Sequence, residues 1–376
     1  MNFEFSEESQ MLRDQAREFL RDKCSPQLAR DVIEGKITFA TSLWQEMATM
    51  GWLGAVVPEA YGGGGLDYEV LCVLAEEIGR AVAPVPFGSS ICLAAEAILA
   101  VGNDTQKRRL LPAIADGSSI GCFALTDGMN PPNAQGIKLV AKESILTGVK
   151  WPVTDGMIAN FAIVAARDTY GIGLYHVDLA QPCVARTSIP AFDSLGANAK
   201  IQFEAAGAER LGDPIDAWPL IEQLLDRAAI LTAFEQIGGA EAALYMARDY
   251  TMGRYAFGRP LASFQAIKHK LADVFVELEI ARANAYYGAW ALSRDEELPL
   301  AAATARVAAI EAARIATKEN IQAHGGVGFT WEFDCHLYYR RAKSLALSLG
   351  GSSYWINRVA DRLEAANAAG GLAGGF

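Results

Sequence analysis

Apolar residues in the first third of the chain recur at intervals of three and four, which is the spacing of a helix with one buried face. The pattern is clearest in three segments: 10–23, 41–53 and 68–83. Ser6, followed by Glu8 and Gln10, predicts a capped helix start. The glycine-rich segment 58–69 predicts a loop between helices. We therefore expect an N-terminal helical domain over residues 1–117.

From about residue 118 to residue 212 the pattern changes to short runs that alternate in polarity or are rich in β-branched residues. Gly, Asp, Asn and Pro separate these runs, as they do between strands. The runs are 121–126, 137–144, 144–153, 161–167, 173–179, 185–190 and 199–206. This pattern predicts a central antiparallel β domain, folded as a barrel or a sandwich.

Helical spacing returns after Pro214 and continues almost to the end of the chain. The helical segments are 218–257, 264–294, 299–326 and 354–369. Gly325 and Gly326 predict a helix C-cap at the end of the third segment. We therefore expect a C-terminal helical domain over residues 213–376, after an N-terminal helical domain and a β domain over 118–212.

Composition narrows the possible functions. The chain has 376 residues and is 51% hydrophobic, enough for two or three domains, and its net charge of −11 argues against nucleic acid as a partner. No apolar run reaches the roughly 20 residues that span a bilayer, and the charged N-terminus is unlike a signal peptide. We therefore expect a cytoplasmic protein without a membrane span. The six Cys and four His residues lack the spacing of metal ligands, a disulfide framework or a Ser-His-Asp site.

Five strings in the chain are more specific than these patterns. They are GWLGAVVPEAYGGGGLDY (51–68), FALTD (123–127), VKWPVTDG (149–156), RYAFGRPLASFQAIKHKLADV (254–274) and IQAHGGVGFTWEF with LYYRRAK (321–343). In this order and spacing, the chain resembles the flavin-dependent acyl-CoA dehydrogenases over essentially its whole length. The resemblance implies an α+β multi-domain fold with a C-terminal four-helix bundle, FAD as cofactor, and assembly into dimers or tetramers.

The resemblance also implies a reaction. Acyl-CoA dehydrogenases introduce a double bond between the α and β carbons of an acyl-CoA thioester. A carboxylate removes the α-proton while the flavin takes the β-hydride, so the protein orients the substrate and the cofactor carries the redox chemistry. Electron-transfer flavoprotein is the acceptor that the resemblance implies.

Several residues match cofactor contacts of the family. Arg254 has the donor geometry that suits a phosphate and matches an arginine on the pyrophosphate of an FAD held mainly by a neighbouring subunit. Phe257 and Gln265 match contacts to the same cofactor, although a surface arginine and a core phenylalanine are the structural alternative. The other matches are Gln322, Gly325 and Gly326 at the adenosine and pyrophosphate, and Thr126 and Thr154 at the isoalloxazine edge. Each glycine or threonine among them also has a structural reading, as a helix cap or as a strand residue.

Two departures affect the cofactor pocket. Pro152 stands where the family usually has an aromatic residue that shields the flavin. The segment 128–136, GMNPPNAQG, replaces a Gly-Ser-Asp turn that meets phosphate. Pro132 in this segment offers no backbone N–H, and Asn130 and Asn133 are poor substitutes.

The usual catalytic base is absent. Most of the family has a Glu where this chain has Gly350, and the alternative base position falls on Ala228. The family's CoA-contacting Arg falls on Ala229. Asp226 points away from that face of the helix, and Glu235 shares the face but lies roughly 10 Å further along the axis. We expect Glu235 to be a polar neighbour in the bundle, and we assign no catalytic residue.

We also expect Asp226 and Arg227 to form a solvated pair. The residues that a subunit lends to a neighbour's FAD are intact, whereas those of its own active site are altered. This asymmetry favours the base-lacking subunit of a heteromeric dehydrogenase, of the bacterial type that acts on bulky acyl-CoAs such as steroid side-chain thioesters. The alternatives are a homo-oligomeric dehydrogenase with a displaced base, or a family member with an oxidase or structural role.

Overall fold

The computed structural model describes residues 5–193, 195–294 and 297–368. The chain forms two compact units, and each is built from separate stretches. The first unit contains residues 5–26, 72–83 and 229–368, and the second contains 27–71 and 84–228. Two helices, α4 (Tyr68–Arg80) and α7 (Trp218–Gly253), each contribute residues to both units.

The second unit combines short helices with a sheet. Its helices and turns are α2 (Pro26–Ile33), α3 (Thr41–Thr49), η1 (Trp52–Gly54), η2 (Glu59–Tyr61), η3 (Phe87–Ala95), α5 (Glu96–Val101), α6 (Asp104–Ala115) and η4 (Ala134–Gly136). The segment η3 is a π-helix, a form that is rare and often found at functional sites. Helix α6 begins with a capping box, because the Asn103 side chain accepts from the Gln106 N–H and the Gln106 side chain accepts from the Asn103 N–H.

The sheet has the order β6-β7-β3-β2-β4-β5-β8, with β1 beside β4. Its strands are β1 (Gly121–Ala124), β2 (Val140–Lys142), β3 (Ile145–Val153), β4 (Phe161–Asp168), β5 (Gly171–Asp178), β6 (Val184–Ser188), β7 (Ala199–Gly207) and β8 (Glu209–Arg210). Most pairs are antiparallel, which confirms the predicted β domain, but β1 and β2 run parallel to β4. Strand β1 follows helix α6 and is not part of a hairpin, so its direction relative to β4 could not be read from turn residues.

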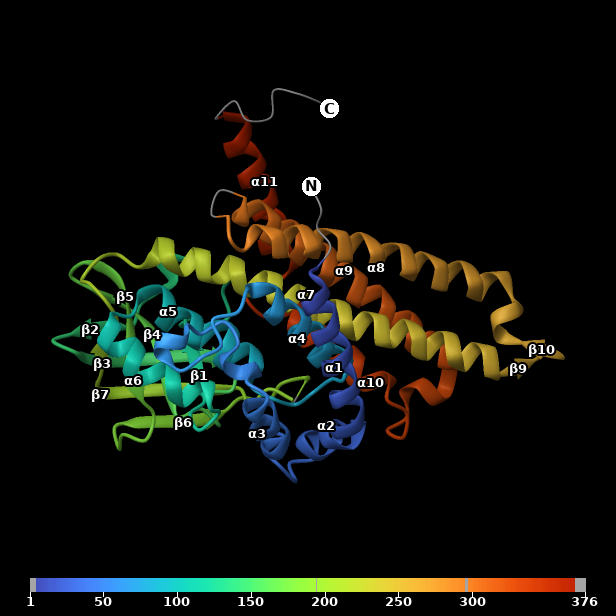
Figure 1. The fold of residues 1–376 in the computed structure, drawn as a ribbon, viewed down its shortest axis with the longest axis horizontal. Coiled ribbons are helices and arrows are strands. Elements are labelled where there is room, and N and C mark those ends of the chain that lie inside the picture. Colours follow the sequence, from blue (N-terminus) through green and yellow to red (C-terminus); the bar gives the residue numbers. More distant parts are fainter. Residues whose placement is uncertain (1–4, 194, 295–296, 369–376) are drawn as a thin grey trace. The chain divides into compact units, whose positions relative to one another are not determined.

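Helices make up most of the first unit. They are α1 (Glu7–Lys23), α8 (Gln265–Ala291), α9 (Leu298–His324), α10 (Cys335–Leu347) and α11 (Ser352–Ala368), with η5 (Leu261–Ser263), η6 (Gly325–Phe329) and a small hairpin of β9 (Tyr255–Ala256) and β10 (Arg259–Pro260). Helices α8, α10 and α11 all pack on α9, whose buried residues are mostly alanine (Figure 1). The predicted C-terminal bundle is thus confirmed. None of the helices, as far as they are described, is long and apolar enough to cross a membrane.

Helices α4 and α7 cross in direct backbone contact within the first unit. A Cβ atom on Gly79 would collide with the Glu235 carbonyl group and lie 2.9 Å from the Glu235 Cα. A Cβ atom on Gly238 would collide with the Glu76 carbonyl group and lie 3.0 Å from the Arg80 nitrogen. Only glycine leaves room for this approach, so the two glycines set the distance between the helices.

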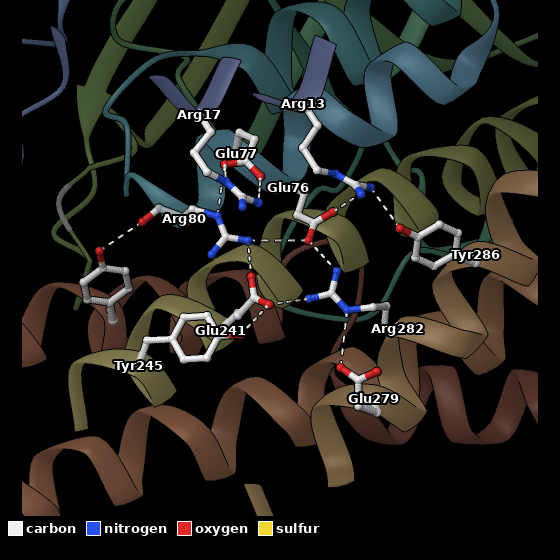
Figure 2. A network of polar contacts seen from close by, with 11 residues as sticks. Arg13, Arg17, Glu76, Glu77, Arg80, Glu241, Tyr245, Glu279, Arg282 and Tyr286 are labelled. Carbon is white, nitrogen blue, oxygen red and sulfur yellow. Dashed lines mark hydrogen bonds and ion pairs between the residues drawn. The ribbon is translucent and has the colours of Figure 1, made fainter. Parts of the chain in front are cut away.

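A network of ion pairs around the buried Glu76 and Glu77 lies at this crossing (Figure 2). Glu76 is fully buried and pairs with Arg282 at 2.6 Å, and Glu241 pairs with Arg282 at 3.0 Å and with Arg80. Glu77 accepts two hydrogen bonds from Arg17. The network joins α1, α4, α7 and α8 because each helix supplies at least one charged group. A buried charge that lost its partner would cost roughly 3–5 kcal/mol, so the pairs fix these four helices together.

We predict that Gly238→Ala strongly destabilises the protein. The added methyl group collides with backbone atoms of α4, which cannot rotate away, so the free energy of unfolding should fall by about 3 kcal/mol. Gly239→Ala is the matched control, since its Cβ would lie 3.4 Å from the nearest atom, an ordinary contact. Urea unfolding of both variants measures the effect, and equal losses in the two would contradict a close crossing.

The ion network also predicts a pH dependence of stability. Burial alone would raise the pKa of Glu241, but Arg80 and Arg282 outweigh burial and lower it below the ordinary 4.5. Glu241 therefore contributes stability above about pH 4.5, and this contribution is lost as pH falls through the lowered pKa. The melting temperature of the wild type should exceed that of Glu241→Gln at pH 7, and the gap should shrink towards pH 3. If the difference in melting temperature stays constant from pH 7 to pH 3, the charge of Glu241 does not stabilise the folded protein.

Candidate functional site

The alternative base position lies in the interior of helix α7. Ala228 is only 1% exposed, and the adjacent Ala229 is also buried. Neither methyl group can accept a proton or bind an anion. This part of α7 thus supplies packing where the resemblance would place a carboxylate and an arginine.

The expectation that Asp226 and Arg227 form a solvated pair is wrong. Asp226 is 1% exposed, and Arg227 donates from Nη1 to the Tyr68 hydroxyl at 3.2 Å. Tyr68 in turn donates to the Glu96 carboxylate at 2.7 Å. These two neighbouring charged residues therefore do not mark an exposed face of α7.

Glu96 is a buried carboxyl group that the sequence patterns did not single out. It lies at the start of α5, inside the apolar run LAAEAILA. Burial raises the pKa of Glu96, while the hydrogen bond from Tyr68 and the charge of Arg227 act in the opposite direction. The only sequence signal for this group was a single acid among apolar residues.

Glu235 is held in an ion pair within the bundle. Its Oε1 accepts from Arg341 Nη2 at 2.6 Å and from Arg341 Nε at 2.9 Å. This agrees with the prediction of a polar neighbour in the bundle. The Glu235 carboxylate is thus occupied by a structural contact within the bundle.

The usual base position is a tight turn between α10 and α11. Leu349 and Gly350 both have left-handed backbone conformations, with φ of 58° and 96°. Gly350 is buried and has no side chain, so the turn carries no carboxylate at this position. The expected helix break is therefore present.

The start of this turn is held by Arg306 of helix α9. Its side chain is fully buried and donates to the Leu345 carbonyl oxygen, and it donates to the Ser348 carbonyl oxygen at 3.1 Å. A guanidinium at the C-terminal end of α10 satisfies carbonyl groups that the helix leaves free and interacts favourably with its dipole. Arg306 was not predicted, because in sequence it is one arginine in an alanine-rich helix.

The predicted cofactor contacts near the hairpin are all exposed. Phe257 is 96% exposed and has a positive φ of 52°, which rules out the core position considered for it. Arg254 and Gln265 are also exposed, and Gln265 is the first residue of α8. Within the described residues, no carboxylate pairs with Arg254. A cation and an aromatic ring are thus presented together at one end of the bundle.

The predicted turn at the end of α9 is both a helix cap and an open surface. The Gly325 N–H donates to the carbonyl oxygens of Gln322 and Ile321, so the predicted C-cap is present. No atom lies within 4 Å of a Cβ built on Gly325 or Gly326, and the Gln322 side chain is exposed. A ligand can therefore approach the backbone closely here.

The two predicted threonines lie in the second unit just after β1 and β3, and Thr126 is hydrogen-bonded to Trp151 of β3. The Trp151 N–H donates to the Thr126 carbonyl oxygen at 3.0 Å, and the Thr126 hydroxyl donates to the Trp151 carbonyl oxygen at 3.2 Å. Thr154 follows Trp151 by three residues, just after the end of β3, and is exposed.

A charged scaffold fixes the turn after Thr154. The buried Asp155 has φ of 58° and accepts from the Ser89 hydroxyl at 2.5 Å and from the Ala197 N–H at 3.2 Å. Arg186 donates from Nη1 to three carbonyl oxygens of the same turn at 2.9–3.2 Å, those of Gly156, Met157 and Ala159. The π-helix η3 and strand β6 thus hold this turn, and nothing in the spacing of the sequence had indicated either contact.

The segment 128–136 uses its own polar groups. The Asn133 side chain accepts from the Gly136 N–H at 2.7 Å and donates to the Pro131 carbonyl oxygen at 2.9 Å. Just before this segment, Asp127 pairs with the buried Lys150, whose pKa burial lowers to about 8. Asn133 therefore stabilises its loop, in agreement with the departure from a phosphate-binding turn.

Comparison with known proteins matches both helical parts of the chain. The model for the N-terminal domain of acyl-CoA dehydrogenase matches residues 6–118, and the model for the C-terminal domain matches residues 217–364. Acyl-CoA dehydrogenase IpdE2 of Mycobacterium tuberculosis is 32% identical over 354 residues, which cover 94% of this chain and 96% of that protein. The mitochondrial short-chain specific acyl-CoA dehydrogenase of Rattus norvegicus is 32% identical over 367 residues, covering 93% and 88%.

Solved structures with the same fold include two whose names each pair two components. A variant of the Tcur3481-Tcur3483 steroid ACAD is 33% identical with a TM-score of 0.87, covering 96% of this chain and 99% of that chain. The ChsE4-ChsE5 complex from Mycobacterium tuberculosis is 26% identical with a TM-score of 0.89, covering 97% and 99%. The motifs, the fold and these matches agree: the chain belongs to the acyl-CoA dehydrogenase family of oxidoreductases.

Proposed function

We propose that this chain is the base-lacking subunit of a heteromeric, FAD-dependent acyl-CoA dehydrogenase. A homologous partner chain supplies the carboxylate that removes the α-proton. The observation that carries this proposal is the absence of an acid at both base positions. Gly350 and Ala228 are both buried, and neither has a side chain that can accept a proton.

The chemistry of the exposed side chains fits FAD. Arg254 supplies a guanidinium for the pyrophosphate, Phe257 an aromatic surface, and Gln265 and Gln322 hydrogen-bonding amides. Gly325 and Gly326 leave the backbone open, and Thr126 and Thr154 provide hydroxyls in the second unit. When bound, FAD supplies two-electron oxidation, and the residues of this chain bind and orient it.

Exposed apolar side chains on this chain support the proposal that it binds a partner chain. Near and within the hairpin they are Met252, Tyr255 and Phe257, and along α8 they are Phe275, Val276 and Ile280. Patches of this kind on a soluble protein typically mark an interaction surface. The names of the similar Tcur3481-Tcur3483 and ChsE4-ChsE5 structures, each of two chains, favour a heteromeric assembly over a homomeric one.

The substrate class follows from the same relatives. A steroid acyl-CoA dehydrogenase is among the similar structures, so we propose a bulky acyl-CoA, such as a steroid side-chain thioester. Electron-transfer flavoprotein is the proposed electron acceptor. This chain is 26% identical to a chain in a solved structure that is named for the electron transferring flavoprotein of Acidaminococcus fermentans.

The observations oppose a self-sufficient enzyme with a displaced base. Glu235 lies on the same face of α7 as Ala228, but it is paired with Arg341. Asp226 is buried and two residues from Ala228, so it faces another direction on the helix. An oxidase would need no such partner and is distinguished by experiment.

In the protein purified with its flavin, Arg254→Ala should weaken the binding of FAD. A charge-assisted hydrogen bond to phosphate contributes about 1.5–3 kcal/mol, so the dissociation constant should rise about 10- to 100-fold. Flavin retained after dialysis, measured by visible absorbance, reports the change. Arg248→Ala is the matched control, because Arg248 is an exposed arginine near the end of α7, six residues before Arg254, and it pairs with Asp249. Equal flavin loss in both variants would argue against a specific role for Arg254.

Purification of the chain alone and with a co-expressed dehydrogenase-like chain tests the proposed function. We expect acyl-CoA-dependent reduction of an electron acceptor only when both chains are present. Replacing the candidate base of the partner with glutamine should abolish this activity. Unaided reduction by the isolated chain would disprove the proposal in favour of a displaced base, and peroxide formation in air would identify an oxidase.

A further inference from the structure

The ring of Tyr354 covers the position where the family's base would begin. A Cβ atom on Gly350 would lie 2.8 Å from Tyr354 Cγ and 3.0 Å from Cε1, and closer still to Cδ1. Carbon atoms that are not bonded to one another do not approach this closely in proteins. Cγ is attached directly to the Tyr354 Cβ, so bending the far end of the side chain does not relieve the contact. The whole ring would have to rotate about χ1.

Neighbouring groups of α11 hold the ring in this position. Trp355 is fully buried and packs against Tyr354 edge to face, with centroids 5.3 Å apart. The Arg358 guanidinium lies 5.6 Å from the Tyr354 centroid and donates to the Tyr354 hydroxyl at 3.2 Å. Rotating the ring would break these contacts together, so it cannot swing aside at low cost.

The backbone beneath the ring is fixed as well. Arg306 holds Ser348 at the start of the turn, and the Gly351 carbonyl oxygen accepts from the Tyr354 N–H at 3.0 Å at its end. Gly350 between them has φ of 96°, a conformation that other residues rarely adopt. The turn can therefore not move away from the ring to make space for a side chain.

We propose that Tyr354 is a steric lock that excludes every side chain, including a carboxylate, from position 350. The absence of the base is then a built property of the turn, and a single Gly350→Glu substitution does not restore it. The catalytic consequence of this inference, that the partner removes the α-proton, rests on the proposed function. The lock itself is a claim about this chain and can be measured without a partner.

A double-mutant cycle on the full chain tests the lock. Gly350→Ala should lower the melting temperature by several degrees, and it should cost much less when Tyr354→Ala is also present. Some loss remains in the double variant because of the positive φ. Tyr354→Phe keeps the ring, so in that background Gly350→Ala should again cause the full loss. Gly351→Ala is the matched control, since its Cβ would meet only Leu347 Cδ2, at 3.9 Å.

The outcomes separate the two proposals. If Gly350→Ala costs the same with Tyr354 and with Ala at position 354, only the backbone conformation opposes a side chain and the lock is disproved. Exchange of the substrate α-proton in D₂O reports a base without requiring flavin reduction. If the isolated wild-type chain catalyses this exchange, the proposed function fails, whereas the thermal cycle still decides on the lock.

Discussion

The close crossing of α4 and α7 is the constraint on which the first unit depends. Gly79 and Gly238 let the two backbones touch, and this contact brings acids and arginines of four helices within ion-pairing distance. Glu76 is fully buried, so its charge is tolerated only because Arg282 and its neighbours are held at that distance. Packing and electrostatics are therefore coupled, because a methyl group at the crossing would separate the charges as well as the helices.

Helix α7 links this constraint to the site. Its first part carries Ala228 and Ala229 in buried positions, and Glu235 near the crossing is tied to Arg341. An acid in the interior needs a partner or loses its charge, and Glu235 and the half-buried Glu241 of α7 are each paired with an arginine. The helix is consequently built for packing and ion pairing, and the proposed site relies on exposed groups elsewhere in the chain.

The turn at Gly350 illustrates how missing chemistry is accommodated structurally. Deleting a side chain usually leaves a cavity, which costs free energy in proportion to its volume. Here the Tyr354 ring fills the space, and Arg306 satisfies the carbonyl groups beside it. The result is a closed, well-packed turn whose role differs from that of an open catalytic turn.

Sequence patterns predicted the parts of the structure that depend on local spacing. Helical and strand periodicity located the long helices, and each predicted strand run overlaps one of the strands β1 to β7. The motifs predicted cofactor contacts between Arg254 and Gly326, and Arg254, Phe257 and Gln265 among them are exposed. Patterns of one or two residues were less reliable. Asp226 and Arg227 look like a solvated pair, yet Asp226 is buried and Arg227 is hydrogen-bonded to Tyr68.

The sequence by itself determined the family, the order of helical and β parts, and the absence of an acid at positions 228 and 350, because these depend on residue identity and short-range periodicity. Only the tertiary structure decided which charges are buried, that Arg306 holds the turn, and that Tyr354 fills the space above Gly350. Those features join residues far apart in the chain or depend on side-chain direction and close packing. Neither distance nor direction leaves a signal in the spacing of residues.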